Sequence, residues 1–182
     1  MGYGVYTDEM KALVAELVRG KEVWDLGAGN LSGTRMMLRM GAARVYAVDK
    51  EDFRLECTPR NTTLLTCPFA DLTLGDTEID VALVAWPVNR SLPGLVSILE
   101  RARTVVYLGS NVGGDACGWP GLFRYLAGRE LLEEVPHRRN SLLVYGAPTE
   151  ERFSGLLAVE EAAALNGALV SYEEARRAYS GA

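Results

Sequence analysis

The stretch VWDLGAGNLSGTRMMLRMGAARVYAVD, residues 23–49, constrains the fold of this chain more than any other part of its sequence. An apolar run leads directly into Gly27 and Gly29, an amphipathic segment over 32–40 follows, and a second apolar run ends at Asp49. Apolar runs of this length predict buried strands, and an intervening helix joins two such strands in parallel. Glycine has no Cβ and tolerates positive φ, so this turn lets the backbone approach a ligand closely. The stretch therefore predicts a strand, helix and strand unit of an α/β sheet with a ligand-binding turn.

The chain continues this alternation of helices and strands as far as residue 148. Periodicity predicts further helices over 8–20, 91–103 and 120–128, and further strands over 64–72, 79–86, 104–110, 130–139 and 140–147. The last two strands are separated only by a polar turn, which predicts an antiparallel hairpin. The composition then shifts to Ala, Glu and Leu, which predicts helices near 150–165 and from Ser171. We therefore divide the chain into a domain over 1–148 and a C-terminal helical extension over 149–182.

Composition and charge narrow the classes of function. Acidic residues number 24 and basic residues 19, and the resulting formal charge of −5 disfavours a dedicated nucleic-acid binder. One histidine and three cysteines without a CxxC spacing do not make a familiar zinc site, so no metal is predicted. The N-terminal residues do not resemble a secretion signal, and no apolar run approaches roughly 18 residues. We expect a cytoplasmic protein that does not enter a membrane.

Two nucleotide ligands are compatible with the glycine turn, a dinucleotide and a sulfonium nucleoside. In both cases Asp49, 20 residues beyond Gly29, would accept hydrogen bonds from the ribose hydroxyls. Asp25, two residues before Gly27, distinguishes between the two ligands. An acid there is unfavourable beside a pyrophosphate, whereas a ligand that carries a sulfonium and an amino group gains from it. The 182 residues also leave little room for the substrate domain of a dehydrogenase, so the sequence favours the methyl donor.

These motifs resemble the class I S-adenosylmethionine-dependent methyltransferase family over residues 1–147. VWDLGAGN resembles the family's first motif, in which an acid stands two residues before a Gly-x-Gly turn. The resemblance implies a Rossmann-like, doubly wound, mostly parallel seven-stranded sheet with a C-terminal antiparallel β-hairpin, here followed by a short helical extension. It also implies S-adenosyl-L-methionine as the cofactor. The sequence departs from the family at Leu31, where many members have a third glycine.

The resemblance also implies a set of cofactor-binding residues. The first motif supplies the methionine end, VYAVDK and FADL supply the adenosine end, and the N-terminal segment and the fourth motif complete the site. In that order, the expected residues are Asp25, Gly27, Ala28, Gly29 and Asn30, then Asp49, Lys50, Asp71 and Leu72, then Tyr6 and Ala85. Asp49 would bind the ribose, Lys50 would lie beside the adenine, Asp71 would accept its amino group, and Leu72 would pack on the ring.

The loop AWPVN, residues 85–89, provides the candidate catalytic residues Trp86, Pro87 and Asn89. Trp86 is either an acceptor contact or a core aromatic, and Asn89 either holds the nucleophile or caps the next helix. Enzymes that methylate nucleobase amines typically have Asn/Asp-Pro-Pro-aromatic here, and this loop lacks the second proline. A nucleic-acid acceptor is therefore not indicated, although the sequence leaves it open. A protein or small-molecule amine or oxygen fits about as well.

Two other functions stay open at this point. The altered acceptor loop is compatible with a non-catalytic S-adenosylmethionine-binding module that acts through a partner. An NAD(P)-dependent oxidoreductase is third, because Asp25 and the chain length disfavour it. For the helices of 149–182 we expect a packing role or a homodimer contact, since their acids disfavour DNA binding.

Overall fold

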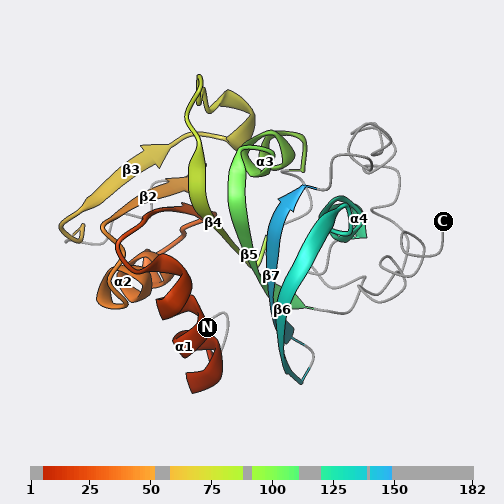
Figure 1. Ribbon diagram of the computed structural model, residues 1–182. Helices are drawn as coiled ribbons and strands as arrows, with labels where there is room; N and C mark the ends of the chain where they lie inside the picture. Colours follow the sequence, from red (N-terminus) through yellow and green to blue (C-terminus); the bar gives the residue numbers. More distant parts are fainter. Residues whose placement is uncertain (1–5, 52–57, 88–91, 111–119, 139, 149–182) are drawn as a thin grey trace.

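The computed structural model describes residues 6–51, 58–87, 92–110, 120–138 and 140–148. Their seven strands form one sheet, with helices packed on it (Figure 1). The strands lie in the order β3-β2-β1-β4-β5-β7-β6. The first five run parallel, whereas β7 is antiparallel to both β5 and β6. Their bounds are β1 Glu22–Leu26, β2 Arg44–Asp49, β3 Thr62–Thr66, β4 Ile79–Ala85, β5 Ala102–Ser110, β6 Arg129–His137 and β7 Asn140–Pro148. The predicted Rossmann-like sheet with its terminal antiparallel hairpin is confirmed.

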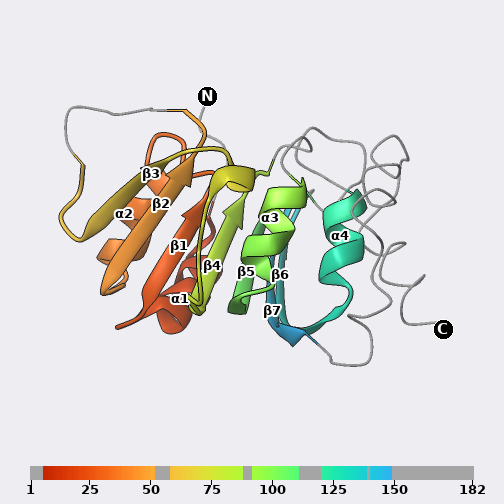
Figure 2. The ribbon, with the colours of Figure 1, turned by 90° about the horizontal axis from the view of Figure 1, so that it is seen from above.

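Helices cover both faces of this sheet (Figure 1 and Figure 2). One face carries α1 Asp8–Val18 and α2 Ser32–Arg39, and the other carries α3 Leu92–Leu99, α4 Pro120–Leu126 and the 3₁₀ helix η1 Phe69–Asp71. The strand order reverses direction between β1 and β4, as in doubly wound folds. Ligands of such sheets bind outside the carboxyl ends of the strands at this point.

The core explains why the central strands are apolar at nearly every position. Along β4, Val81 and Leu83 pack into the cluster under α1 and α2, which includes Met10. The intervening Ala82 and Val84 pack into the cluster under α3 and α4. A parallel sheet covered on both faces needs apolar residues on both sides of each strand. The continuous apolar run 81–86, which follows Asp80, is the sequence pattern of such a strand.

The strand predicted over 64–72 is only partly correct. The observed β3 starts earlier, at Thr62, and ends at Thr66. Pro68 follows and cannot donate to a strand ladder, and the chain then turns into η1. Phe69, within η1, packs against the cluster that includes residues of α3. The apolar residues at the end of this run therefore contact a helix and do not extend the sheet.

The helix predicted over 91–103 is also shorter than expected. It ends at Leu99, and Ala102 already belongs to β5. The guanidinium of Arg129 donates to the carbonyl of Leu99 at 2.8 Å and to that of Ala102. A cation and a donor at a helix C-terminus satisfy carbonyls that another helical turn would otherwise use. Arg129, 30 positions after Leu99 in the sequence, thus provides a hydrogen bond at the end of α3.

Several predictions concern parts of the chain outside the described residues. These are the helices near 150–165 and from Ser171, the homodimer contact assigned to them, and the role of Asn89. The division at 148/149 also stays a prediction. Among the residues that the structure describes, no helix is both long and apolar enough to cross a membrane.

Candidate functional site

The turn after β1 is held against the end of β2 by backbone hydrogen bonds. The amides of Gly27 and Ala28 both donate to the carbonyl of Val48, at 2.9 and 3.0 Å. Gly27 has φ of 84° and Gly29 has φ of 48°, conformations that glycine adopts without steric cost. No heavy atom lies within 4 Å of a Cβ built on Gly27. The turn therefore presents bare backbone at the carboxyl edge of the sheet.

Leu31 keeps the left-handed shape that a third glycine would give this loop. It stands at the N-cap of α2 with φ of 63°, and its amide donates to the carbonyl of Ala28 at 2.8 Å. The left-handed conformation costs a non-glycine residue about 1–2 kcal/mol. The Leu31 side chain is buried against Ala28 and Ala47, and such burial contributes about 1.5–3 kcal/mol. Burial of the Leu31 side chain therefore offsets the cost of its left-handed conformation.

Asp49 joins the end of β2 to this turn. Its Oδ2 accepts a hydrogen bond from the amide of Gly29 at 2.9 Å, and its Oδ1 accepts one from the amide of Glu51 at 3.1 Å. The side chain is half-buried, and an ionised carboxylate can accept further bonds on both oxygens. The 20-residue spacing noted in the sequence thus corresponds to a direct contact between the acid and the glycine turn.

Asp25, in β1 just before the turn, is buried against the first turn of α2. Its side chain is buried, and its Oδ2 accepts a hydrogen bond from the Thr34 hydroxyl at 2.6 Å. Burial raises the pKa of Asp25 to about 6, the bonds from Thr34 oppose this rise, and the nearby charge of Asp49 adds to it. A Cβ on Gly33 would lie only 3.2 Å from the same oxygen, so this glycine makes room for the acid. The site therefore contains a buried, proton-binding carboxylate.

Tyr6 is brought to the same part of the molecule from the start of the chain. It stands beside Thr7, whose hydroxyl accepts a bond from the amide of Met10 at 3.2 Å and so caps α1. Burial raises the pKa of Tyr6 well above its usual value, and the charge of Asp25 raises it further. The N-terminal segment and the acid of the first motif are thus electrostatic neighbours, a pairing that the sequence analysis did not specify.

The other predicted cofactor residues are distributed along the same edge of the sheet. Asn30 is engaged locally, because its Oδ1 accepts from the amide of Ser32 at 3.1 Å. Lys50 is exposed, with its Nζ 3.6 Å from a carboxylate oxygen of Glu51. Asp71 is exposed at the end of η1, and Leu72 is half-buried against the core. Asn30 and Lys50 already have partners within the chain, whereas Asp71 is exposed to solvent.

The acceptor loop begins with an unusual backbone conformation. Trp86, which follows the half-buried Ala85, has φ of 54°, and its amide donates to the carbonyl of Leu108 at 2.8 Å. The ring packs against the cluster under α1 and α2, and its buried Nε1 has no hydrogen-bond partner among the described residues. Pro87 is buried, and Asn89 is outside the described ranges. A bulky residue at positive φ is a strained position, and such strain clusters at functional sites.

Sequence reasoning missed two residues that shape the site. Thr34 is fully buried and holds Asp25, and Leu108 holds the backbone of Trp86 from the neighbouring strand. Thr34 could have been predicted from the sequence, because its hydroxyl stands in the first turn of α2, shortly after the glycines. Nothing in the sequence indicates the second, because it depends on the pairing of β4 with β5.

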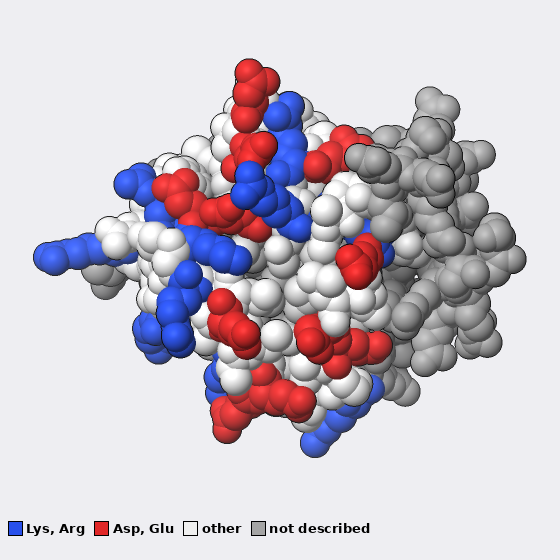
Figure 3. Space-filling model, in the orientation of Figure 1, with Lys and Arg blue, Asp and Glu red and all other residues white. Residues whose placement is uncertain are grey.

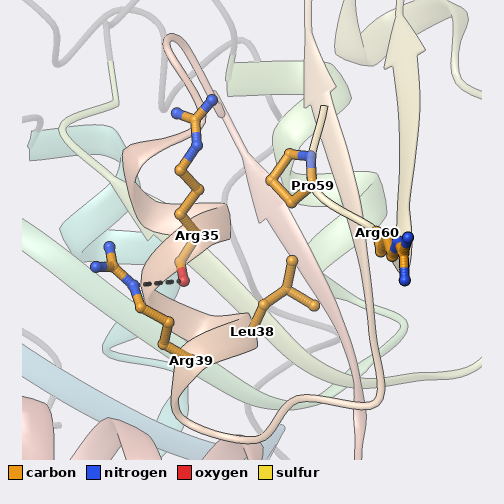
Figure 4. Close-up of a pocket in the computed structure, with 5 residues that line it drawn as sticks. All are labelled: Arg35, Leu38, Arg39, Pro59 and Arg60. Atoms are coloured by element: carbon orange, nitrogen blue, oxygen red, sulfur yellow. Dashed lines mark hydrogen bonds between the residues drawn. The ribbon is translucent and has the colours of Figure 1, made fainter. Parts of the chain in front are cut away.

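An open cavity of about 500 Å³ lies elsewhere, on the outer side of α2. It is lined by Arg35, Leu38, Arg39, Pro59 and Arg60 (Figure 4). The three guanidinium groups point in different directions and do not converge on one point (Figure 4). Basic side chains also gather on the surface at this end of the molecule, over α2 and β3 (Figure 3). None of the predicted site residues lines this cavity, although Arg35 of its lining donates to the carbonyl of Asn30 at 2.9 Å.

Within the described ranges, no group of three His, Cys, Asp or Glu side chains is arranged to hold a metal ion.

Solved structures with the same arrangement include several methyltransferases. The 1,6-didemethyltoxoflavin-N1-methyltransferase of Burkholderia thailandensis, solved with S-adenosylhomocysteine, has a TM-score of 0.57 and 19% identity. The match covers 78% of this chain and 78% of that chain. The chain has the class I methyltransferase fold.

Two more structures with the class I methyltransferase fold extend this result. An rRNA methylase from Streptococcus thermophilus has a TM-score of 0.54 and 16% identity, covering 78% of this chain and 95% of its own. Precorrin-6y C5,15-methyltransferase from Geobacter metallireducens has a TM-score of 0.54 and 15% identity, covering 82% and 94%. No protein-family model and no curated protein sequence matches the chain. The three enzymes are named for acceptors of different chemistry, so the fold does not select an acceptor.

Proposed function

We propose that this chain binds S-adenosyl-L-methionine at the turn after β1 and catalyses methyl transfer to an acceptor bound near the end of β4. The observation that carries the proposal is the contact between Asp49 and the amide of Gly29. It brings an acid with free acceptor capacity to a turn of bare backbone at the switch point of a doubly wound sheet. A ribose placed there would meet the carboxylate through its two hydroxyls.

The residues around the turn fit a cationic nucleoside. Asp25 is a buried carboxylate that lies within the electrostatic reach of Tyr6 and Asp49. It forms none of the ion pairs found among the described residues. Burial of a charge without a cation is costly, and a bound group of positive charge would offset this cost. A pyrophosphate would instead add negative charge beside two carboxylates.

When bound, S-adenosyl-L-methionine supplies an activated methyl group on a sulfonium. The protein's own contribution is then to bind and orient the two reactants. Asp49 would fix the ribose, Asp71 and Leu72 the purine, and the glycine turn the methionine end. Orientation of two reactants at near-attack distance is worth about 7–11 kcal/mol in favourable cases. No strong general base is needed for a neutral amine acceptor.

The acceptor would contact the loop that starts at Trp86. Its strained backbone and the Trp86 Nε1, which has no partner among the described residues, favour a role for this loop beyond packing. We propose Trp86, Pro87 and Asn89 as the residues nearest the acceptor. The acceptor itself would be an amine or oxygen of a protein or small molecule, with a nucleobase as the less favoured class. The cytoplasmic location and the homodimer through 149–182 belong to this proposal as well.

Calorimetric titration with S-adenosylmethionine, S-adenosylhomocysteine and NAD tests the cofactor. We expect binding of the first two, and a loss of ten-fold or more in Asp49→Ala, because hydrogen bonds to a charged group contribute about 1.5–3 kcal/mol. Asp76→Ala is the matched control. Asp76 is an exposed aspartate in a turn that follows η1, and it is not one of the predicted site residues. Unchanged affinity in Asp49→Ala would place the nucleoside elsewhere, and saturable binding of NAD alone would favour the oxidoreductase.

A non-catalytic module remains the second candidate, since the ring of Trp86 packs into the core cluster under α1 and α2. It predicts that the protein binds the cofactor but that no acceptor class gives turnover. A screen of amine and oxygen acceptors with radiolabelled methyl donor separates the two functions. Transfer that depends on Trp86 would support the enzyme.

A further inference from the structure

The backbone of α3 touches the backbone of η1 at a glycine. Gly94 lies in the first turn of α3, and a Cβ built on it would lie 2.5 Å from the carbonyl carbon of Phe69 and 2.8 Å from Cα of Ala70. The amide nitrogen of Ala70 is closer still. Real Cβ atoms essentially never come within 3.0 Å of such atoms. Any other residue at this position would therefore push the two elements apart.

The element held in this way carries the predicted purine contacts. Asp71 is the last residue of η1, and Leu72 is its C-cap. The hydrogen bonds of η1 are local: the amide of Asp71 donates to the carbonyl of Pro68 at 3.0 Å, and that of Leu72 donates to that of Phe69 at 3.3 Å. Such bonds fix the shape of η1 but do not fix its place in the molecule. That place is set by packing on α3.

The other end of the same segment is hydrogen-bonded to Asp49, the residue proposed to bind the ribose. The amide of Cys67 donates to the carbonyl of Asp49 at 2.9 Å, which continues the pairing of β2 with β3. The chain between Cys67 and Leu72 is thus anchored to Asp49 at one side and to α3 at the other. A shift of α3 would change the position of Asp71 relative to Asp49.

We propose that Gly94 is a positioning residue for the purine end of the cofactor site. The proposal rests on the proposed function, because it assumes that Asp71 and Leu72 face the base. The absence of a side chain at Gly94 lets α3 hold η1 at the depth where the Asp71 carboxylate meets the 6-amino group. An alanine must separate the backbones of α3 and η1 by more than about 0.5 Å, the difference between 3.0 and 2.5 Å, because the amide of Ala70 is closer still. A hydrogen bond of about 2.9 Å lengthened by that amount is largely lost.

The test compares two ligands in two glycine variants. The ligands are S-adenosylhomocysteine and its analogue that lacks the 6-amino group. The variants are Gly94→Ala and, as the matched control, Gly146→Ala. Gly146 is in β7, and the atoms nearest its new Cβ would be those of the Leu132 side chain, at 3.4 Å.

We expect the native protein and Gly146→Ala to prefer S-adenosylhomocysteine by about ten-fold, as for a hydrogen bond to a charged group. In Gly94→Ala the preference falls to about two-fold, mainly through weaker binding of S-adenosylhomocysteine. Adding Asp71→Asn to Gly94→Ala should change the preference no further, since both act on one interaction. A native preference retained in a folded Gly94→Ala would overturn the proposal, as would a further loss in the double variant.

Failure of the proposed function gives a different result, because the native protein then binds neither ligand. If Gly94→Ala does not fold, hydrogen exchange of the native protein decides. S-adenosylhomocysteine should slow exchange in residues 68–74 and 92–99 together, since the inference makes them one body. Protection confined to 68–74 would contradict it.

Discussion

Two turns lie side by side at the carboxyl edge of the sheet, one after β1 and one after β4, and they are built differently. The turn after β1 has two glycines at positive φ, and its left-handed Leu31 is buried and bonded. The turn after β4 places a tryptophan at positive φ and leaves its Nε1 without a partner in the described part of the chain. Both turns are bonded to a neighbouring strand, the first to Val48 and Asp49 of β2 and the second to the carbonyl of Leu108 in β5. They differ in that the second leaves a buried side-chain donor without a partner among the described residues.

Under the proposed function, the turn after β1 would belong to the cofactor-binding half of the site and the turn after β4 to the acceptor half. A turn that is complete before any ligand arrives is suited to a constant partner, such as a cofactor. A strained turn with an unused donor is suited to a site whose partner completes it. Four predictions test the contrast, and they are given from the largest expected effect to the smallest.

The largest effect on stability is expected for Asp25→Asn. The folded-state pKa of about 6 lies above the ordinary 3.8, so the buried acid destabilises the ionised protein. Two pKa units correspond to about 3 kcal/mol, which sets the upper limit of the gain at pH 7. Asparagine keeps an acceptor for the Thr34 hydroxyl. Denaturant unfolding at pH 7 should therefore show Asp25→Asn to be more stable than the native protein by up to this amount.

The same change should cost affinity for the cationic ligand. S-adenosylmethionine carries a sulfonium that S-adenosylhomocysteine lacks, so Asp25→Asn should weaken the former more. Equal losses for both ligands would mean that the charge of Asp25 does not serve the sulfonium. Thr34→Val is the companion variant, because it removes the hydroxyl and keeps the charge.

The pH dependence of unfolding gives the second prediction. A raised pKa means that the folded protein binds the proton of Asp25 more tightly than the unfolded chain does. The contribution of Asp25 to stability is therefore fully present below about pH 4, is lost as the pH rises to about 6, and then stays constant. The difference between native protein and Asp25→Asn should open across this window. A constant difference from pH 4 to 7 would contradict the buried position of the acid.

The third prediction concerns Leu31→Gly. Glycine removes about 1–2 kcal/mol of backbone strain but gives up about 1.5–3 kcal/mol of buried side chain, so we expect a net loss near 1 kcal/mol. Affinity for S-adenosylhomocysteine should change less than three-fold, because the turn keeps its shape. Leu31→Ala, which loses the burial and keeps the strain, is the control and should be the less stable variant of the two. A Leu31→Gly protein more stable than the native one would show that Leu31 is simply strained.

How much of this could be predicted depends on how far apart the interacting residues are in the sequence. The strand, turn and helix around Gly27, with Asp49 at the end of the next strand, follow from periodicity and glycine chemistry within 27 residues, 23–49. The ends of β3 and α3 did not follow, because α3 meets Arg129 and η1 meets Gly94 only in the folded chain. The left-handed conformation of Trp86 could not be predicted from the sequence either. Its sequence context is an apolar strand, and its conformation depends on the carbonyl of Leu108.

The smallest effect is expected for Trp86→Phe, which tests the second turn alone. Phenylalanine keeps an aromatic ring in the core cluster and removes the buried Nε1, so stability should stay within about 1 kcal/mol of the native value. Affinity for S-adenosylhomocysteine should be unchanged, since the turn after β1 does not involve Trp86. If the indole donor completes the acceptor site, turnover of the acceptor falls while cofactor binding does not. A loss of cofactor affinity in Trp86→Phe would instead show that the two turns act as one site, and it would contradict the division into a binding half and an acceptor half.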